Sequence, residues 1–445
     1  MISFKIFCLI VSILMYVVMM SIMIIFERDK PKRIIIWSIL FLFTQLIGFI
    51  AYIVHRKIYH DKCKSLVVKE LEDNVYTGLS SAKMTNKSVK YDDDLLLHNE
   101  LAFDAKVVKN TNFDILNSYD KFKTNLLKEL KSSKKYILLE LDKINPKYFE
   151  DIIEVLKERA ESGVIVKLVH EKRIPRKIVK TLRMSKAKVY RFSKKNVCSG
   201  EYVNIRNIIV IDGRVAYLGS LNIDNKQLDP QVDVASAVLK IKGDLVQNIN
   251  LALHQDIVFA SGKYIEYDED EEKISNDSIS QYVSNKYESS IELLLIRAIC
   301  KARKSIQMEL TSFIPTESIM SLLHFAINSN IDVRLMVPLK TNIGSRFYAS
   351  RAYAKELALL GANVYLYDGY IRFNAINVDD DYLLYGAFSM DRAKILTNLQ
   401  NICVIKDNNI IHHFNKLFDE GINNSYRINN AKYMLLREKF FKNFV

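Results

Sequence analysis

The sequence is poor in cysteine, and the placement of its five cysteines excludes two kinds of structure. They are Cys8, Cys63, Cys198, Cys300 and Cys403. Their number is odd, and no two of them stand at the close spacing of a metal-ligand pair. Because Cys8 lies inside an apolar run, the set also forms no disulfide framework of the type found in small secreted domains. We therefore expect a reducing compartment, with neither disulfides nor a metal site.

Two long runs near the N-terminus contain no charged residue at all. They extend from Ile6 to Phe26 and from Ile34 to Val54, and seven residues, Glu27 to Arg33, join them. At ~1.5 Å per residue in a helix, each run is long enough to cross ~30 Å of hydrocarbon. A cleaved signal peptide is the alternative for the first run, but its apolar part is too long and no small-residue cleavage site follows. The runs predict a two-helix transmembrane hairpin.

The charges beside the apolar runs leave the orientation in the membrane open. The connecting loop and the segment after the second run hold equal numbers of basic residues, so the positive-inside rule favours neither side. These residues are Arg28, Lys30, Lys32 and Arg33 in the loop, and Arg56, Lys57, Lys62 and Lys64 after the second run. We expect a multi-pass protein of the cell membrane. Because the scattered cysteines favour a reducing compartment, we expect its soluble domains to lie in the cytoplasm.

Acidic residues are outnumbered, with 51 Asp and Glu against 64 Lys and Arg and a formal net charge of +13. A basic chain favours an anionic partner. Beside two membrane-spanning segments, the simplest such partner is the surface of an anionic bilayer rather than nucleic acid. A generic solvated basic surface remains the alternative.

From about residue 110 onward, helical and extended patterns alternate, which predicts an α/β chain with a largely parallel, two-sided sheet. The pattern occurs twice. Val164 to Val169 is similar to Ile331 to Met336 at a shift of 167 residues, and the same shift places Asp212 on Asp379. Self-similarity at one fixed shift indicates a duplicated domain.

The duplication and the composition divide the chain into five parts. Between the two copies lies an acidic and polar stretch whose Asp and Glu residues are not spaced like the ligands of a cation site, so a solvated linker is the favoured interpretation. The parts are a hairpin anchor (residues 1–60), a juxtamembrane linker (61–109), a first domain (110–265), the acidic and polar linker (266–280) and a second domain (281–445).

The segment from Asn204 to Asp212, followed by Ala216 to Asp224, resembles the signature of the phospholipase D superfamily and specifically that of bacterial cardiolipin synthases. In that family each half carries His-x-Lys, four further residues and Asp, then a Gly-rich turn ending in Asn. The two copies meet at one active site. Counted back from Asp212, the His position holds Ile205 and the Lys position holds Asn207.

The second copy of the motif shows the same double replacement. It extends from Arg372 to Asp379, with Arg372 at the His position and Asn374 at the Lys position. Similarity to the family continues through the N-terminal runs, Thr311–Pro315, Arg334–Lys340 and Tyr365–Tyr370, so it covers essentially the whole chain. The resemblance implies two phospholipase D-like domains with pseudo-twofold symmetry, preceded by the transmembrane hairpin.

The chemistry that the resemblance implies depends on groups that are missing here. One neutral imidazole attacks phosphorus, the other protonates the leaving alkoxide, and the lysine pair offsets charge on the phosphoryl oxygens. Ile205 can act neither as the nucleophile nor as the general acid. Arg372 stays protonated because its pKa exceeds ~12. None of the eight histidines lies within eight residues before either motif Asp. His170, at a predicted strand end, is a possible substitute, although a lone histidine there is more often structural.

Groups that bind phosphate remain, since Arg side chains and the backbone amides of Gly-rich turns suit such a ligand. The candidate phosphate-binding residues are Arg206, Ser220, Asn222, Arg372 and Ser389. The sequence leaves two interpretations of Asp212 and Asp379 open: retained ligand binding, or hydrogen bonds between a strand and a turn. No cofactor is expected.

The interpretation that the sequence supports best is a catalytically inactive membrane protein that binds phosphatidylglycerol or cardiolipin, or that pairs with an active cardiolipin synthase. The alternative is an active phosphatidyltransferase that condenses two phosphatidylglycerol molecules into cardiolipin and glycerol. A nucleic-acid-binding function rests on the net charge alone, and the two apolar runs argue against it.

Overall fold

The computed structural model describes two α/β halves and an N-terminal helical segment. Some of the features predicted from the sequence lie outside the described residues. Among these are Glu27 to Arg33, most of the juxtamembrane linker and residues 266–273 of the acidic and polar linker. The described residues are 2–26, 34–44, 46–54, 89, 92–142, 144, 146–171, 174–192, 203–219, 234–235, 238–262, 274–285, 290–339, 344–371, 373–395, 398–428 and 436–444.

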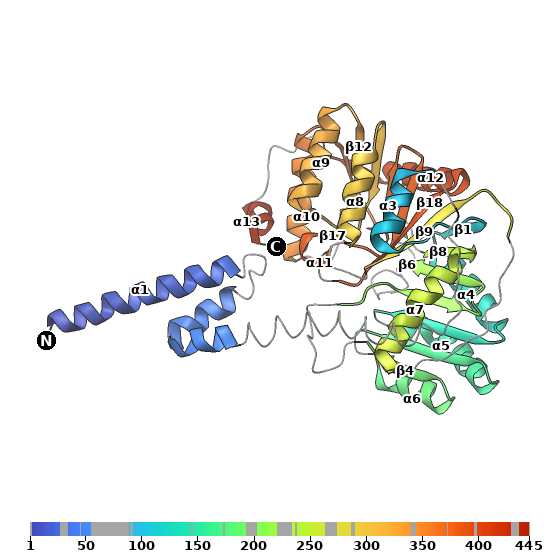
Figure 1. Cartoon of the computed structure of the whole chain (residues 1–445), viewed down its shortest axis with the longest axis horizontal. Helices are drawn as coiled ribbons and strands as arrows, with labels where there is room; N and C mark the ends of the chain where they lie inside the picture. The colour runs from blue at the N-terminus through green and yellow to red at the C-terminus, as the bar shows by residue number, and fades with distance from the viewer. Residues whose placement is uncertain are drawn as a thin grey trace.

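The N-terminal segment is helical and projects from the body along the long axis of the molecule (Figure 1). α1 (Ile2–Phe26) and the helical residues 34–44 and 46–54 enclose a small cluster of Met19, Met23, Phe41 and Tyr52. Among the residues that the structure describes, no helix combines the length and the apolar character that a membrane crossing requires. The predicted transmembrane hairpin is therefore not confirmed.

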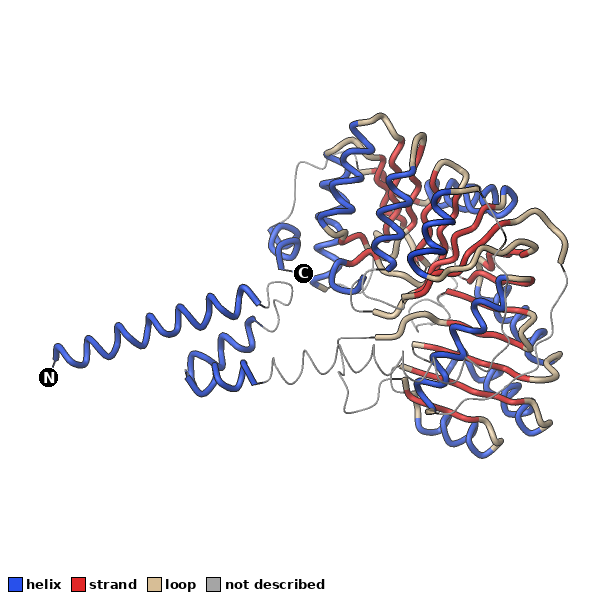
Figure 2. Tube along the Cα trace, viewed as in Figure 1, coloured by secondary structure: helices blue, strands red, loops and turns tan. Residues whose placement is uncertain are grey.

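The body contains two large mixed sheets (Figure 2). In each sheet three neighbouring strands run parallel, and the strands beside them pair antiparallel. The largely parallel sheet expected from the alternating pattern does not form, because each motif segment folds into an antiparallel hairpin within its sheet.

The first sheet has seven strands and the second has eight. In spatial order, the first consists of β1 (Thr111–Leu116), β8 (Val238–Gly243), β6 (Val215–Gly219), β5 (Ile208–Ile211), β2 (Tyr136–Leu141), β3 (Ile165–His170) and β4 (Lys188–Arg191). The second consists of β9 (Ile279–Ser284), β18 (Asn401–Lys406), β16 (Tyr382–Gly386), β15 (Asn374–Val378), β10 (Ser305–Glu309), β12 (Asp332–Pro338), β13 (Asn363–Tyr367) and β19 (Ser425–Arg427). Each strand of the first sheet has a counterpart at the same place in the second, from β1 and β9 at one edge to β4 and β13, and only the edge strand β19 is extra. This agreement confirms the duplication.

The helices form two outer layers and one shared inner layer. α4 (Tyr119–Lys131), α5 (Pro146–Glu161) and α6 (Arg176–Met184) cover the outer face of the first sheet. α3 (Asp94–Phe103), α8 (Ser290–Lys301), α9 (Glu317–Asn328) and α10 (Ser345–Leu359) cover that of the second. α7 (Leu245–Ser261) and α12 (Asn408–Asn423) supply buried side chains to a core that both sheets share. The short α11 (Arg392–Ile395) and the C-terminal α13 (Leu436–Phe444) complete the set of labelled helices.

The side chains of each strand point alternately to the two faces of the sheet, so each sheet contributes to two hydrophobic cores. In β5, Ile208 and Val210 belong to the shared core, whereas Ile209 and Ile211 belong to the outer core of the first half. Successive side chains of a strand point to opposite faces, so a run of four apolar residues buries both faces at once. The first motif segment is thereby held between the outer core of its own half and the shared core.

Part of the range predicted as a juxtamembrane linker is ordered on the second half. Asp93 caps α3 and also contacts Lys301 at 3.0 Å, Lys406 at 3.2 Å and the hydroxyl of Tyr382. Burial opposes the charge of Asp93, but these donors and the Leu96 N–H lower its pKa to about 2. The carboxylate therefore attaches the segment before the first domain to β16 and β18.

Candidate functional site

The two halves touch at the start of each motif segment. Ile205 N–H donates to the Leu399 carbonyl, and Leu399 N–H donates to the Val203 carbonyl, both at 3.0 Å. On the other side, β14 (Tyr370–Ile371) precedes the second motif and pairs with β7 (Val234–Ala235) of the first half. The start of each motif thus lies against the opposite half.

The two motif aspartates close a turn within their own half. Asp212 and Asp379 have φ values of 53° and 57°, a left-handed conformation that Asp tolerates better than most residues. Each carboxylate accepts three backbone N–H groups at 2.7 to 2.9 Å. The donors are Lys134, Lys135 and Tyr136 in the first half and Arg303, Lys304 and Ser305 in the second. The sequence left open whether these aspartates bind a ligand or form hydrogen bonds between a strand and a turn. The contacts in the structure are of the second kind.

The two asparagines of the motif segments make equivalent contacts. The side-chain oxygen of Asn207 accepts the Asp142 N–H at 2.9 Å, and that of Asn374 accepts the Thr311 N–H at 2.7 Å. Their amide groups donate to the carbonyls of Ile205, at 3.0 Å, and Phe388. Both side chains are buried. Each asparagine therefore binds the backbone that follows a central strand, instead of presenting a charge to a ligand.

A buried ionic network lies beside the start of the first motif. Arg206 pairs through one terminal nitrogen with Asp256 of α7 and donates through the other to the Asn285 carbonyl at 2.9 Å. Asn204 donates to Glu140, and its own side-chain oxygen accepts the Arg206 N–H at 3.0 Å. Arg206, Asp256, Glu140 and Asn204 are all at least nine-tenths buried.

The charges in this network follow from burial and proximity. Burial raises the pKa of Glu140 well above its ordinary value, and the nearby Asp256 carboxylate raises it further. Burial opposes the charge of Arg206, but the Asp256 carboxylate raises the pKa of that guanidinium above its ordinary value. The neutral form of Glu140 is therefore favoured beside the Arg206–Asp256 ion pair. The predicted phosphate ligand Arg206 is already engaged between α7 and the segment before α8.

The other sequence-predicted site residues are only partly described. Ile205 is half-buried, and Ser389 is buried with its N–H donated to the side-chain oxygen of Gln400 at 2.6 Å. Ser220, Asn222 and Arg372 lie outside the described residues. His170, considered as a substitute catalyst, is a buried residue at the end of β3. In the described ranges, no group of His, Cys, Asp and Glu could hold a metal ion.

Sequence reasoning missed the partners of Arg206. Glu140 had one usable signal, because it is the single charged residue of the fully buried strand β2, and a lone carboxyl in such a run needs a partner. The sequence holds no such signal for Asp256 or Asn285. They lie 50 and 79 residues from Arg206, and only the folded chain brings them to it.

Comparison with known proteins places both halves in one family. The model of the family described as "Cardiolipin synthase, PLD-like domain" matches residues 126–256 and 295–422. Among similar proteins, cardiolipin synthase 2 of Bacillus cereus is 25% identical over 440 residues, covering 90% of this chain and 83% of that protein. Cardiolipin synthase 1 of Staphylococcus epidermidis is 26% identical over 463 residues, covering 94% and 91%.

Solved structures show the same fold at low sequence identity. Phosphatidylserine synthase of Haemophilus influenzae aligns with a TM-score of 0.58 and 12% identity, over 78% of this chain and 97% of that one. The likeness extends over both halves and concerns the fold alone. The overall fold of this chain is therefore also found in that protein.

Proposed function

Because the chain belongs to the cardiolipin synthase family of phospholipase D-like proteins, we propose that it is a membrane-associated phospholipid-binding protein without phosphatidyl-transfer activity. Its ligands are phosphatidylglycerol and cardiolipin. Its role is to bind these lipids or to adjust an active cardiolipin synthase in the same membrane.

The proposed loss of activity is supported best by the hydrogen bonds of Asn207 and Asn374. Both occupy the position of a family lysine, and both are bonded on each side to buried backbone. Neither position offers a cation to phosphoryl oxygens, and the positions of the two imidazoles hold Ile205 and Arg372. Removing one covalent nucleophile typically costs ~10⁴ to 10⁶ in rate, and here both imidazoles and both lysines are replaced.

Phosphate binding is supported by what remains at the motif starts. Arg206 is neutralised by Asp256, so Arg372 is the motif cation that we assign to the lipid phosphate. A guanidinium binds phosphate through two parallel N–H groups, which a neutral side chain cannot replace. Ser220, Asn222 and Ser389 supply further polar groups from the turns of the two motifs.

Membrane association is supported by the N-terminal helical segment. Large apolar side chains such as Phe43 and Ile47 are more than three-fifths exposed there, and contiguous apolar surface of this kind marks a lipid or protein contact. We assign the segment to the lipid of the cell membrane, with the two domains on the cytoplasmic side.

Binding of a short-chain phosphatidylglycerol tests the proposal directly. We expect the full chain, held in phosphatidylcholine nanodiscs at ~0.1 M salt, to bind dihexanoyl-phosphatidylglycerol more tightly than the phosphatidylcholine analogue. Arg372→Gln is expected to weaken that binding by about tenfold to 100-fold, because a charge-assisted hydrogen bond is worth ~1.5 to 3 kcal/mol.

The matched control is Arg176→Gln, on the exposed first turn of α6, which is expected to bind as the unmodified chain does. Calorimetric titration gives both affinities. Equal binding of the two lipids, or an Arg372→Gln variant that binds as well as the control, would contradict the assignment.

A further inference from the structure

The C-terminal helix α13 is fixed to the second half by its inner face. Glu438 is buried and pairs with Lys355 at 2.7 Å and with Arg351 at 3.7 Å, both on α10. One turn further on, Lys442 pairs with Glu356 at 2.5 Å. A buried carboxylate with two cations holds a short helix firmly, since breaking such a contact leaves an unpaired charge.

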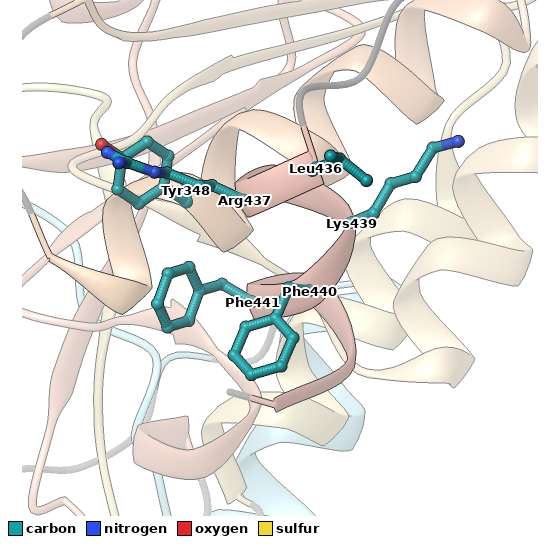
Figure 3. Close-up of a pocket in the computed structure, with 6 residues that line it drawn as sticks. All are labelled: Tyr348, Leu436, Arg437, Lys439, Phe440 and Phe441. Carbon is teal, nitrogen blue, oxygen red and sulfur yellow. The ribbon is translucent and has the colours of Figure 1, made fainter.

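The outer face of α13 carries exposed apolar and basic side chains. Leu436 is 87% exposed and Phe440 is 54% exposed, and the neighbouring Arg437 and Lys439 are exposed as well. Between this face and the start of α10 lies a surface pocket of about 810 Å³ (Figure 3). Its lining consists of Tyr348, Leu436, Arg437, Lys439, Phe440 and Phe441.

The composition of this face fits a bilayer surface. A short helix with large apolar side chains next to Arg and Lys places the former at the acyl boundary and the latter among the headgroups. A soluble partner is disfavoured by position: along the long axis, α13 lies at the end of the body from which the N-terminal helices project (Figures 1 and 2). The net charge of +13 also favours an anionic surface.

We propose that the outer face of α13 is a second lipid contact, which seats Leu436 and Phe440 in an anionic bilayer. The proposal rests on the membrane association proposed above. It adds that the body itself, and not only the N-terminal segment, rests on the lipid.

The same helix, α10, also connects α13 to the region that follows the second motif. α10, to which α13 is bonded, begins next to Arg346, and Arg346 pairs with the fully buried Asp391 at 3.0 Å. Asp391 is the last residue of β17 (Met390–Asp391), a short strand that follows the second motif. Through α10, the residues of α13 are therefore connected to the strand that follows the second motif.

Site-specific photo-cross-linking of the full chain tests the contact. Phe440→benzoylphenylalanine is prepared in nanodiscs of phosphatidylglycerol and phosphatidylcholine in equal parts, irradiated, and its adducts are identified by mass spectrometry. The matched control is Phe325→benzoylphenylalanine, a 70% exposed phenylalanine on α9. We expect lipid adducts at position 440 at least about five times as abundant as at position 325.

A charge variant tests the preference for anionic lipid. Lys439→Glu, in the Phe440→benzoylphenylalanine background, is expected to lower the ratio of phosphatidylglycerol to phosphatidylcholine adducts about fivefold or more, since one basic residue near an anionic surface contributes ~1 kcal/mol. An unchanged ratio would remove the anionic preference from the proposal.

The other outcomes each overturn the contact. Adducts to a second copy of the chain would make the face a subunit interface, and adducts to α1 or to residues 34–54 would make it an internal contact. Equal lipid adducts at positions 440 and 325 would mean that the face has no special contact. None of these results depends on Arg372 or on phosphatidyl transfer, so failure here is distinguishable from failure of the proposed function.

Discussion

Arg206→Met is expected to lower the free energy of unfolding by about 3 to 5 kcal/mol. The guanidinium is the partner of the buried Asp256 carboxylate and also binds the Asn285 carbonyl. Methionine fills a similar volume but leaves Asp256 charged and unpaired beside Glu140. Removing one member of a buried pair costs more than removing both, because the remaining charge stays desolvated.

The size of this effect is measured by urea unfolding of the full chain, followed by far-ultraviolet circular dichroism. Arg176→Met, an exposed arginine on α6, serves as the matched control and is expected to change stability by less than about 0.5 kcal/mol. The double variant Arg206→Met with Asp256→Leu is expected to recover part of the loss, because no buried charge is left unpaired. If Arg206→Met unfolds at the same urea concentration as the control, the pair does not join the elements as described.

The second large effect concerns activity, and we expect it only when all four motif positions are restored. Ile205→His with Asn207→Lys supplies one imidazole and one lysine, but Arg372 still occupies the place of the second imidazole. Arginine has the wrong pKa to protonate a leaving alkoxide. Adding Arg372→His and Asn374→Lys restores the whole set, and cardiolipin formation above background is expected in this quadruple variant alone.

The structure adds a reason why any recovery will be small. Asn207 and Asn374 each hold a buried backbone N–H, of Asp142 and of Thr311, and a lysine there leaves that donor unsatisfied. Each loss costs about 1 to 3 kcal/mol of stability. Cardiolipin is measured by mass spectrometry, with a control that carries Ile205→Gln in place of Ile205→His. Activity in that control, or in the first-motif double variant, would contradict the requirement for two imidazoles.

The duplicated fold could be predicted because it leaves local traces in the sequence. Tyr136 to Leu141 is an uninterrupted apolar run apart from Glu140, and it forms the fully buried strand β2. The shift of 167 residues also holds for the first residues of β5 and β6, which correspond to positions within β15 and β16. The prediction of a largely parallel sheet was wrong, since the periodicity of a strand is the same in parallel and antiparallel pairs and did not reveal the antiparallel hairpins.

The candidate site could be located from the sequence only as a set of positions, and its contacts could not. The motif positions were found by counting residues, and the replacements at Ile205 and Asn207 follow from the sequence alone. The bonds from Asn207 to Asp142 and from Arg206 to Asp256 join residues 65 and 50 positions apart. Such contacts depend on how strands and helices pack, and a single sequence records no sign of them.

Incubation of the unmodified protein with phosphatidylglycerol tests the central claim most directly. The full chain is purified from a host without its own cardiolipin synthases, placed in phosphatidylglycerol vesicles, and cardiolipin is measured by mass spectrometry over time. We expect no cardiolipin above that of protein-free vesicles, because Ile205, Asn207, Arg372 and Asn374 supply neither a nucleophile nor a general acid. Cardiolipin that accumulates in proportion to the amount of protein would contradict this account and identify the chain as an active phosphatidyltransferase.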